Sequence, residues 1–580
     1  MSDKLYAGRK GNKNLSTAHK RSNIKNRRPP NRHSVEADSE FVSTSAKKLK
    51  VDDKYDRDVD DLFGYRFVNF LPVFTAISQV VVCKECKGDV SFSEGSRRGL
   101  GSKIILTCKN CGDHSISTCP LINNRGYEIN TRIVFAMRLL GIGINGIKKF
   151  CSFMCLPKPV FQVTYDKIVA NIAIATESVR TLCLKEAAEK EKLISINQGE
   201  NDGLTVSGDG SWRRRGFSSL FGVTTLIGWH TGKVLDVCVK SKYCKICEYW
   251  ARKVGTAEYE EEYAKHESQC EANHTGSAGK MEVDSVVEMF QRSETLHNVK
   301  YLNYIGDGDS KTYKGIVDAK PYENCSVFKK ECVGHVEKRM GTRLRNLKKT
   351  TKGLGGRGKL TGKLIDELTI FYGLAIRRNT GSVEKMRNDI WATLYHKISS
   401  DEKPQHDKCP SGVDSWCSWQ RAKALGSLTS YTHKPPMPEV VFKTIKPIYK
   451  DLSSDDLLSR CLGGYTQNAN ESFNSVVWSI APKAVSSGKK VVDIATDIAV
   501  LNFNDGLSSL FPVYDTLGLS VGRNLYDFCL ESDENRIKAA EHSLSDAAKN
   551  ARRSITSMRK ELEETNTTTE GQLYGAGIAE

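Results

Sequence analysis

Apolar and polar residues alternate in several short stretches of the chain, a pattern typical of β-strands with one buried face. Between residues 203 and 240, three such runs separated by turns predict a meander of three strands: LTVSGDGSW, SSLFGVTTLIGW and KVLDVCVK. Tyr301–Ile305 predicts a later strand, and NCSVFK predicts a further piece of sheet. We expect these strands to meet in one mixed sheet.

Apolar residues recur with helical spacing before, between and after these strands. The spacing is clearest in residues 125–190, in MEVDSVVEMFQRSETL, in IDELTIFYGLAIRRN and in the helix that begins near Glu471. Gly141 and Gly143 divide the first segment into two helices joined by a turn. That shape suits either a DNA-reading unit or core packing, and we favour packing because no recognition face is obvious. The whole pattern predicts the α/β (α+β) class.

The composition is that of a soluble globular protein, with 39% hydrophobic and 27% charged residues in a chain of 580. The net charge of +17 favours a polyanionic partner such as a nucleic acid. No apolar run approaches the ~20 residues that cross a bilayer, so no membrane partner is expected. The first 30 residues lack the apolar core of a signal peptide.

Residues 1–50 contain 13 Lys or Arg and four acids, which predicts a disordered basic tail. Such a tail is either simply solvated, or it serves as a nuclear-import signal or a DNA-binding arm. The import interpretation predicts a nuclear protein.

The 18 cysteines include several pairs with metal-ligand spacing. Cys83 and Cys86 form one C-x-x-C pair, Cys108 and Cys111 form another, and the β-like runs AISQVVV and SKIILT precede them. Two such pairs predict a zinc ribbon with four thiolates around one ion. A structural role is the default for this ribbon, with DNA binding as the alternative.

Two later groups of Cys and His residues also resemble zinc sites. The first group, in which His274 competes for the fourth position, is Cys244, Cys247, His266 and Cys270. The second has a less familiar spacing, which leaves zinc binding and ordinary packing open; it is His396, His406, Cys409 and Cys417.

Three acids have settings that suit a second kind of metal site. Asp209 ends a strand and lies between two glycines, and Asp307 follows a later strand, with Asp309 as its fallback. Glu471 lies early in a helix, and Asn474 on the same face would orient its carboxylate. Turn residues and an exposed helix glutamate are the ordinary explanations. If the three acids converge, they predict two Mg²⁺ or Mn²⁺ ions acting on a phosphodiester.

Basic residues beside these acids predict a surface that binds phosphate. Residues 329–363 contain 12 Lys or Arg and two acids. Cys332 and His335 lie one helical turn apart at its start, where packing and a hydrogen bond would explain them equally well. The predicted DNA contacts are Trp212, Arg213, Arg214, Arg215, Cys332, His335, Lys338, Arg339, Arg343 and Arg345.

Four motifs together resemble the Mutator-like transposase domain: GDGSW at Asp209, GDGDS at Asp307, CVGH at Cys332 and TQNANESFNSVVW around Glu471. The segments HESQCEANHTGSAGKME and HDKCPSGVDSWCSW are similar to the animal branch of that family. The resemblance covers roughly residues 66–535. Its four-cysteine ribbon departs from the WRKY-like zinc domains of plant relatives.

The resemblance implies a DDE transposase with a ribonuclease H-like core and a catalytic triad of Asp209, Asp307 and Glu471. It also implies a helical insertion between the last two acids, and a C-x2-H element near the active site. Such a protein would bind transposon ends and target DNA, cut and join strands, and act as a homo-oligomer. The alternatives are a domesticated transposase that only binds DNA or chromatin, and an RNA-processing nuclease.

The expected organisation combines these predictions. In order along the chain it comprises a disordered basic tail (1–65), the zinc ribbon (66–120), a helical DNA-binding or packing region (121–200), the first part of the ribonuclease H-like core (203–330) with a zinc-binding insert (242–275), a basic and helical insertion (331–460), the last part of the core (461–532) and a polar helical tail (533–580).

Overall fold

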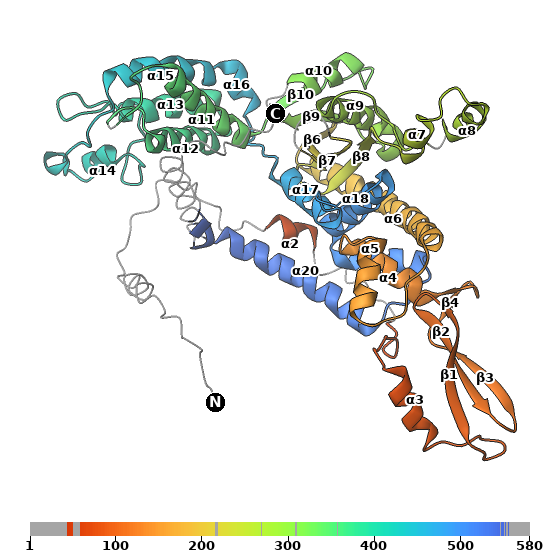
Figure 1. Ribbon diagram of the computed structural model, residues 1–580. Helices are drawn as coiled ribbons and strands as arrows, with labels where there is room; N and C mark the ends of the chain where they lie inside the picture. The colour runs from red at the N-terminus through yellow and green to blue at the C-terminus, as the bar shows by residue number, and fades with distance from the viewer. Residues whose placement is uncertain are drawn as a thin grey trace, which may run out of the picture. The chain divides into compact units, whose positions relative to one another are not determined.

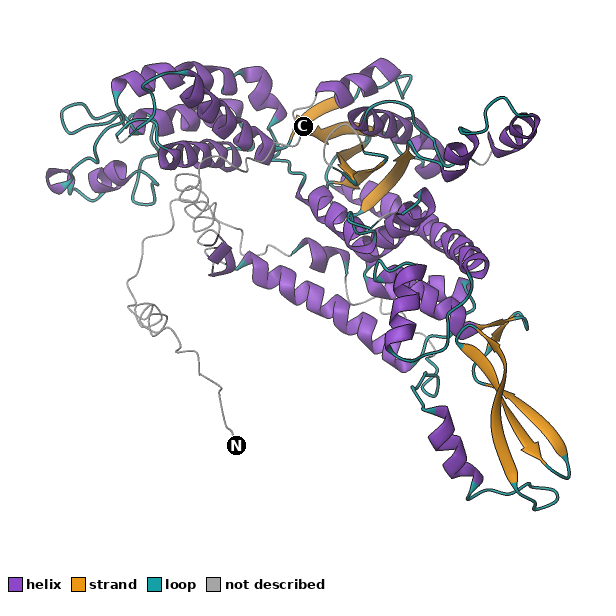
Figure 2. Ribbon diagram, in the orientation of Figure 1, coloured by secondary structure: helices purple, strands orange, loops and turns teal. Residues whose placement is uncertain are grey.

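The computed structural model describes most of the chain between residues 43 and 555 (Figures 1 and 2). The described residues are 43–49, 59–214, 219–267, 270–307, 310–356, 358–485, 487–545, 547–549, 551–552 and 555. Most of the predicted basic tail and the end of the predicted polar tail lie outside them. The chain divides into two compact units. We call Glu337–Leu458 the helical unit, and the described residues of Ser39–Val336 and Ser459–Glu580 the core unit.

A five-stranded mixed sheet forms the centre of the core unit, in the order β10-β9-β6-β7-β8. Its strands are β6 (Leu204–Trp212), β7 (Phe221–Gly228), β8 (Val234–Ser241), β9 (Tyr301–Gly306) and β10 (Phe328–Glu331). The first three pair antiparallel, whereas β9 is parallel to β6 and β10 is parallel to β9. The predicted meander and the strand at Tyr301 are confirmed. The predicted piece NCSVFK is only partly a strand, because β10 begins at Phe328.

Helices cover both faces of this sheet. Successive side chains of a strand point to opposite faces, so strands with apolar residues at successive positions need cover on both sides. Val206, Leu226 and Tyr304 face the helix α9 (Ala278–His297), where Val286 and Phe290 are buried with them. The opposite face packs on helices from both ends of the chain, namely α6 (Gln162–Asn197), α17 (Asn468–Ile480) and α18 (Lys489–Asp505). All eight residues of β7 are buried, as expected for a strand covered on both sides. The predicted α/β class with a mixed sheet is confirmed.

The N-terminal part of the core unit begins with α3 (Phe70–Ser78) and an antiparallel sheet of β1 (Val90–Arg98), β2 (Gly101–Cys108) and β3 (Gly112–Ser117). A short hairpin, β4 (Leu121–Ile122) and β5 (Gly126–Tyr127), follows. The run AISQVVV was predicted as a strand, and this is wrong. Its first three residues end α3, and no regular strand follows before Cys83.

The predicted pair of helices around Gly141 and Gly143 is α4 (Glu128–Leu139) and α5 (Ile144–Phe153). Phe135 and Ile147 lie in the same hydrophobic core as α6 and α18. The pair therefore packs in the core, as we favoured. The C-terminal part of the unit adds α19 (Phe511–Thr516) and α20 (Arg523–Leu544).

The helical unit consists of α12 (Gly362–Arg378), α13 (Val383–His396), α14 (Ser418–Ala424) and α15 (Glu439–Leu452), with most of α11 (Val333–Thr350) and the start of α16 (Asp455–Arg460). Thr361 and Ser382 cap α12 and α13 by accepting hydrogen bonds from the backbone N–H groups three residues on. Its buried side chains include Leu368, Tyr372 and Tyr449. Among the described residues, no helix has the length and apolar character needed to cross a membrane.

Candidate active site and metal clusters

Side chains of β6 and α17 are joined by a ladder of three hydrogen bonds. Its rungs are Ser207 Oγ to Asn470 Oδ1 at 2.7 Å, Asn474 Nδ2 to Asp209 Oδ2 at 2.8 Å and Trp478 Nε1 to Ser211 Oγ at 2.7 Å. Four helical residues rise about 6.0 Å and two strand residues about 6.6 Å, so every second residue of β6 meets every fourth residue of α17. The ladder fixes the position of α17, and with it Glu471, along β6.

Asp209 is the middle rung, and its surroundings are acidic. The strand continues to Trp212, so Asp209 lies three residues before the end of β6 and not at its tip. The pKa of this carboxyl is raised from 3.8 to about 6, first by burial and then by the charges of Asp307 and Glu471, against the opposing effects of His335 and the Gly210 N–H. Charges act in this way only when they lie close together. The structure therefore brings Asp209, Asp307 and Glu471 to one corner of the core unit.

His335 reaches this corner through the start of α11. The Cys332 N–H donates to the Gly306 carbonyl at the end of β9, and the Val333 N–H donates to Tyr465, just before α17. Burial of the Cys332 thiol raises its pKa, but hydrogen bonds from His335 outweigh burial and the net shift is downward. The C-x2-H pair thus lies beside the segments that hold Asp307 and Glu471.

The amide of Asn474 has a different role from the one predicted. We expected it to orient Glu471 on its own helix, but it donates to Asp209 across the ladder. Its oxygen Oδ1 is buried and accepts no hydrogen bond, and the same holds for Oε1 of Gln467, whose Nε2 donates to the Gly208 carbonyl at 2.6 Å. Carboxyl and amide oxygens are the hard ligands that Mg²⁺ and Mn²⁺ prefer. Among the described residues, however, the three acids are not one of the groups whose ligand atoms all lie within 4.8 Å of one another. Asp309, the fallback for Asp307, lies outside the described residues.

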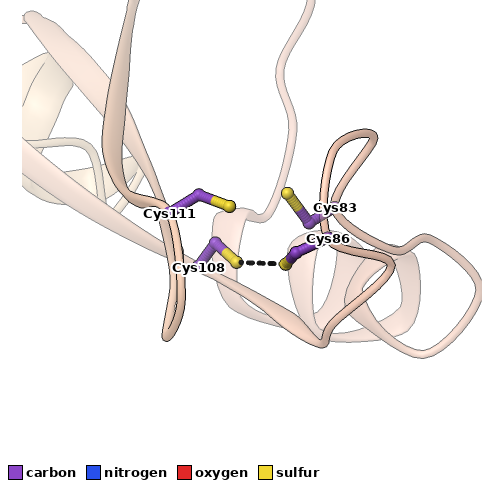
Figure 3. A group of neighbouring side chains, drawn as sticks. All are labelled: Cys83, Cys86, Cys108 and Cys111. Atoms are coloured by element: carbon purple, nitrogen blue, oxygen red, sulfur yellow. Dashed lines mark hydrogen bonds between the residues drawn. The ribbon is translucent and has the colours of Figure 1, made fainter.

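The four cysteines of the predicted ribbon face one another (Figure 3). All four sulfurs lie within 4.8 Å of one another, and Cys86 Sγ is 3.4 Å from Cys108 Sγ. A tetrahedral zinc ion with Zn–S bonds of about 2.3 Å would hold sulfurs at roughly this separation. Cys108 and Cys111 lie on either side of the tight turn from β2 to β3, which Gly112 permits with a φ of 84°. These residues fit a zinc ion.

The second group also converges, on an insert between β8 and α9. Nε2 of His266 lies 3.3 Å from both Cys244 Sγ and Cys247 Sγ, and Cys247 Sγ lies 3.3 Å from Cys270 Sγ. The competing residue, His274, lies elsewhere: its Nδ1 is 3.5 Å from Asp284 Oδ2. The four-ligand set without His274 therefore fits zinc.

The third group lies in the helical unit and also fits zinc. Its spacing in the sequence had left zinc binding and ordinary packing as alternatives. Nδ1 of His406 is 3.2 Å from Nδ1 of His396 and 3.4 Å from Cys417 Sγ, and Cys409 completes the set. Nε2 of His406 faces the other way, toward Ser399 Oγ at 2.8 Å and His433 Nε2 at 2.9 Å.

His433 continues this contact outward from the third group. Its Nδ1 lies 2.6 Å from Oδ1 of Asp401. An imidazole that binds zinc through Nδ1 has its proton on Nε2, and a partner there fixes the tautomer and the ring orientation. Asp401 and His433 were not predicted from the sequence. The signal for them was a third histidine, 27 residues after His406.

The predicted DNA contacts have mixed surroundings. The Trp212 indole N–H donates to Ala278 at the start of α9, and Arg213 donates to Ser487, whereas Arg214 is exposed. In the helical unit, Arg343 pairs with Asp451 at 3.4 Å and Arg345 pairs with Asp366 at 2.6 Å, which lowers their net positive charge. Lys338 is exposed and Arg339 half-buried. Arg215 lies outside the described residues.

These observations describe a mixed α/β protein with three Cys/His clusters suited to zinc and one corner rich in carboxyls. Residues 64–417, more than half of the chain, match the family Mutator-like transposase. The chain belongs to this family. The match includes Asp209, Asp307 and the Cys332–His335 pair, and it ends before Glu471. No curated protein matches the chain.

Proposed function

We propose that the protein is a DDE transposase that cuts and joins DNA with a divalent metal ion at Asp209, Asp307 and Glu471. One observation carries the proposal. The carboxyls of Asp307 and Glu471, from segments far apart in sequence, lie close enough to Asp209 for their charges to raise its pKa together with burial. Neighbouring negative charges make ionisation of a largely buried carboxyl costly, and a bound cation would offset that cost.

The sheet supports a ribonuclease H-like core for this reaction. An antiparallel meander of three strands continues into two strands parallel to the first of them, in the order β10-β9-β6-β7-β8. The first acid lies on the first strand of the meander and the second follows the adjacent parallel strand. The third lies on α17, which packs against the same first strand. This is the arrangement expected of the DDE class.

The residues around the acids would hold the metal ions in position. When bound, Mg²⁺ or Mn²⁺ would activate a water or a 3′-hydroxyl and stabilise the leaving oxygen. Asn474 holds one oxygen of Asp209, so the other oxygen and the two amide oxygens remain available to the site. Glu471 is exposed at the first turn of α17, where it is accessible to a bound DNA strand.

The partner proposed for this site is double-stranded DNA, namely transposon ends and target DNA. The net charge of +17 supports a polyanion, and the basic residues at 1–50 support a nuclear location. We also propose that the protein acts as a homo-oligomer, since strand transfer requires two ends to be held together.

A cleavage assay tests the proposal. Full-length protein is incubated with Mg²⁺ or Mn²⁺ and with DNA from both flanks of its coding region, where inverted repeats are first sought. Asp307→Asn and Glu471→Gln should abolish nicking and strand transfer. Glu189→Gln changes an exposed glutamate of α6 and is the matched control, which should retain full activity.

Two results would change the assignment. Full activity in the Glu471→Gln protein would remove that residue from the site. Tight, salt-sensitive binding without cleavage in any metal would favour the alternative, a domesticated transposase that binds DNA or chromatin without cutting it.

A further inference from the structure

The helix α5 packs on the core by one face only (Figure 1). Its side chains Ile147 and Cys151 are buried in the core that α5 shares with α4 and α6. Four side chains on another face are polar and exposed: Asn145, Lys148, Lys149 and Ser152. Their spacing of three and four residues places them within an arc of about 100° along the helix. We call these four residues the α5 face. Core packing therefore leaves a polar face of α5 open to a partner.

The turn that joins α4 to α5 spans the four residues 140–143 and is fixed by hydrogen bonds. The Gly141 N–H donates to the Arg138 carbonyl, and Gly141 has a φ of 74°. The Ile142 N–H donates to the Met137 carbonyl, which completes a Schellman motif. The buried guanidinium of Arg138 donates in turn to the Ile142 carbonyl at 2.9 Å. Two helices joined by so short a turn with a glycine are typical of the helix-turn-helix unit, whose second helix enters the major groove of DNA.

Charge favours a nucleic acid as the partner of the α5 face. Residues 129–165 contain five Lys or Arg and no Asp or Glu. Lys148, Lys149 and Lys158 are exposed, and none of them is ion-paired within the described part of the chain. Lysine, asparagine and serine side chains are common hydrogen-bonding partners of base edges and phosphates. Phe153, which is 84% exposed at the end of α5, adds an apolar contact of the kind that thymine methyl groups accept.

We propose that α5 reads the base sequence of double-stranded DNA from the major groove, through Asn145, Lys148, Lys149 and Ser152. The ten residues of α5 extend about 15 Å, and the groove is about 12 Å wide, so the helix fits into it. The inference explains how transposon ends are distinguished from other DNA, because net charge alone gives no sequence preference. It rests on the DNA partner proposed above but not on the three acids.

The turn before α5 also contacts the helix that carries Glu471. A Cβ added at Gly141 would lie 2.7 Å from Cδ of Pro482 and 3.0 Å from the Ile480 carbonyl, at the end of α17. From Ile480 back to Glu471, α17 rises about 14 Å, which is the length of about four base pairs of duplex. A sequence read at α5 is therefore held at a fixed distance from the acids.

Selection from a random-sequence duplex library tests this inference, with the full zinc-loaded chain and without Mg²⁺ or Mn²⁺. We expect the wild type to enrich a defined motif. Asn145→Ala and Lys148→Ala should each lower the preference for this motif over a scrambled duplex by about tenfold, because each removes a base contact. Lys190→Ala changes a similarly exposed lysine of α6 and should leave the preference unchanged. No motif in the wild type, or an unchanged preference in both α5 variants, would overturn the inference.

Photo-cross-linking identifies the partner of the α5 face directly. Ser152 replaced by the photoreactive benzoylphenylalanine should cross-link to the selected duplex. A cross-link to protein alone would show that an acidic protein covers this face, and would overturn the inference.

Asp209→Asn protein should enrich the same motif, because the acids are not part of the α5 face. A wild type that enriches a motif but cuts no DNA would contradict only the proposed chemistry. A wild type that cuts DNA equally well with and without Asn145 and Lys148 would contradict only the reading by α5.

Discussion

Two aspartates on the same sheet are treated in opposite ways. Asp236 on β8 is 2% exposed, and Arg292 of α9 grips it with two hydrogen bonds of 2.6 and 2.9 Å. Asp209 on β6 has an uncharged amide as its hydrogen-bond partner, and the charges of two other acids act on it. The charge of Asp236 is neutralised by Arg292 within the fold. The charge of Asp209 lies near two other negative charges, and a bound cation would offset that repulsion. The contrast distinguishes a carboxyl that is paired within the fold from one that we propose as a metal ligand.

The largest expected effect is on cleavage. Asp209→Asn should lower the rate of DNA cleavage by about three orders of magnitude or more, because a metal ligand contributes several kcal/mol to the transition state. Asp236→Asn should leave the rate per folded molecule unchanged. Both are measured by single-turnover cleavage, with the folded fraction determined by circular dichroism. Equal losses in the two variants would remove the distinction.

For the free energy of unfolding we expect the opposite ranking, with the larger loss in Asp236→Asn and not in Asp209→Asn. Asp236→Asn should lower the free energy of unfolding by about 2 kcal/mol, because Arg292 loses two charge-assisted hydrogen bonds and keeps only Glu288, at 3.0 Å, as a carboxylate partner. Calorimetry of the core transition measures the loss. Adding Arg292→Met to Asp236→Asn should recover part of it, since the guanidinium that lost its bonds to Asp236 is then absent. A double variant no more stable than the single one would argue against the pairing as the cause.

Asp209→Asn, in contrast, should stabilise the metal-free protein. The pKa of Asp209 is about 6 in the folded state against 3.8, so the folded protein binds this proton more tightly than the unfolded chain. The ionised carboxyl therefore costs stability above pH 6, by at most about 3 kcal/mol, and the cost fades as the pH falls from 6 toward 3.8. The variant should melt higher than wild type at pH 7.5 and equally near pH 4. A gain that did not change with pH would point to another cause.

The sequence predicted the sheet well but the site only in part, for physical reasons that differ between residues. The strands β6 to β9 are short apolar runs separated by turns, and this pattern located them, although β7 begins at Phe221 and so three residues later than the predicted run. The apolar run at 67–82 has no polar residue at regular intervals, and periodicity alone does not distinguish a buried strand from a helix there. The partner of Asn474 lies 265 residues away along the chain, so only the folded chain shows that it is Asp209.

In the third Cys/His group, in the helical unit, an acid lies one residue away from a ligand: Asp401 contacts His433, and His433 contacts His406. His433→Ala should weaken zinc binding at this one site by about 10-fold, because Nε2 of His406 would lose one of its two partners and keep only Ser399 Oγ at 2.8 Å. Competition with a chromogenic chelator, on the full chain, should show one of the zinc ions released earlier. His542→Ala, a change on α20 far from the cluster in sequence, should not alter the release. Unchanged release in both would leave His433 without a role at the metal.

An effect of similar size is expected at the ladder. Asn474→Ala should raise the Mg²⁺ concentration for half-maximal cleavage by about tenfold, because Asp209 would lose its fixed orientation. Trp478→Phe removes the neighbouring rung, to Ser211, and should leave the metal requirement unchanged. Titration of cleavage against Mg²⁺ measures both. A similar shift in the two variants would mean that Asn474 has no specific effect on the metal site and that any broken rung displaces α17.

The ladder also predicts where the chain tolerates changes of length. Each rung requires a helical and an extended rise to agree to within a fraction of an ångström, so adding or removing one residue between Asn470 and Trp478 would rotate the later partners by about 100° away from β6. No such register applies between Asp307 and Glu471, where a whole helical unit is already accommodated. Length variants among relatives should therefore accumulate in that interval and be almost absent from the nine residues that begin at Asn470.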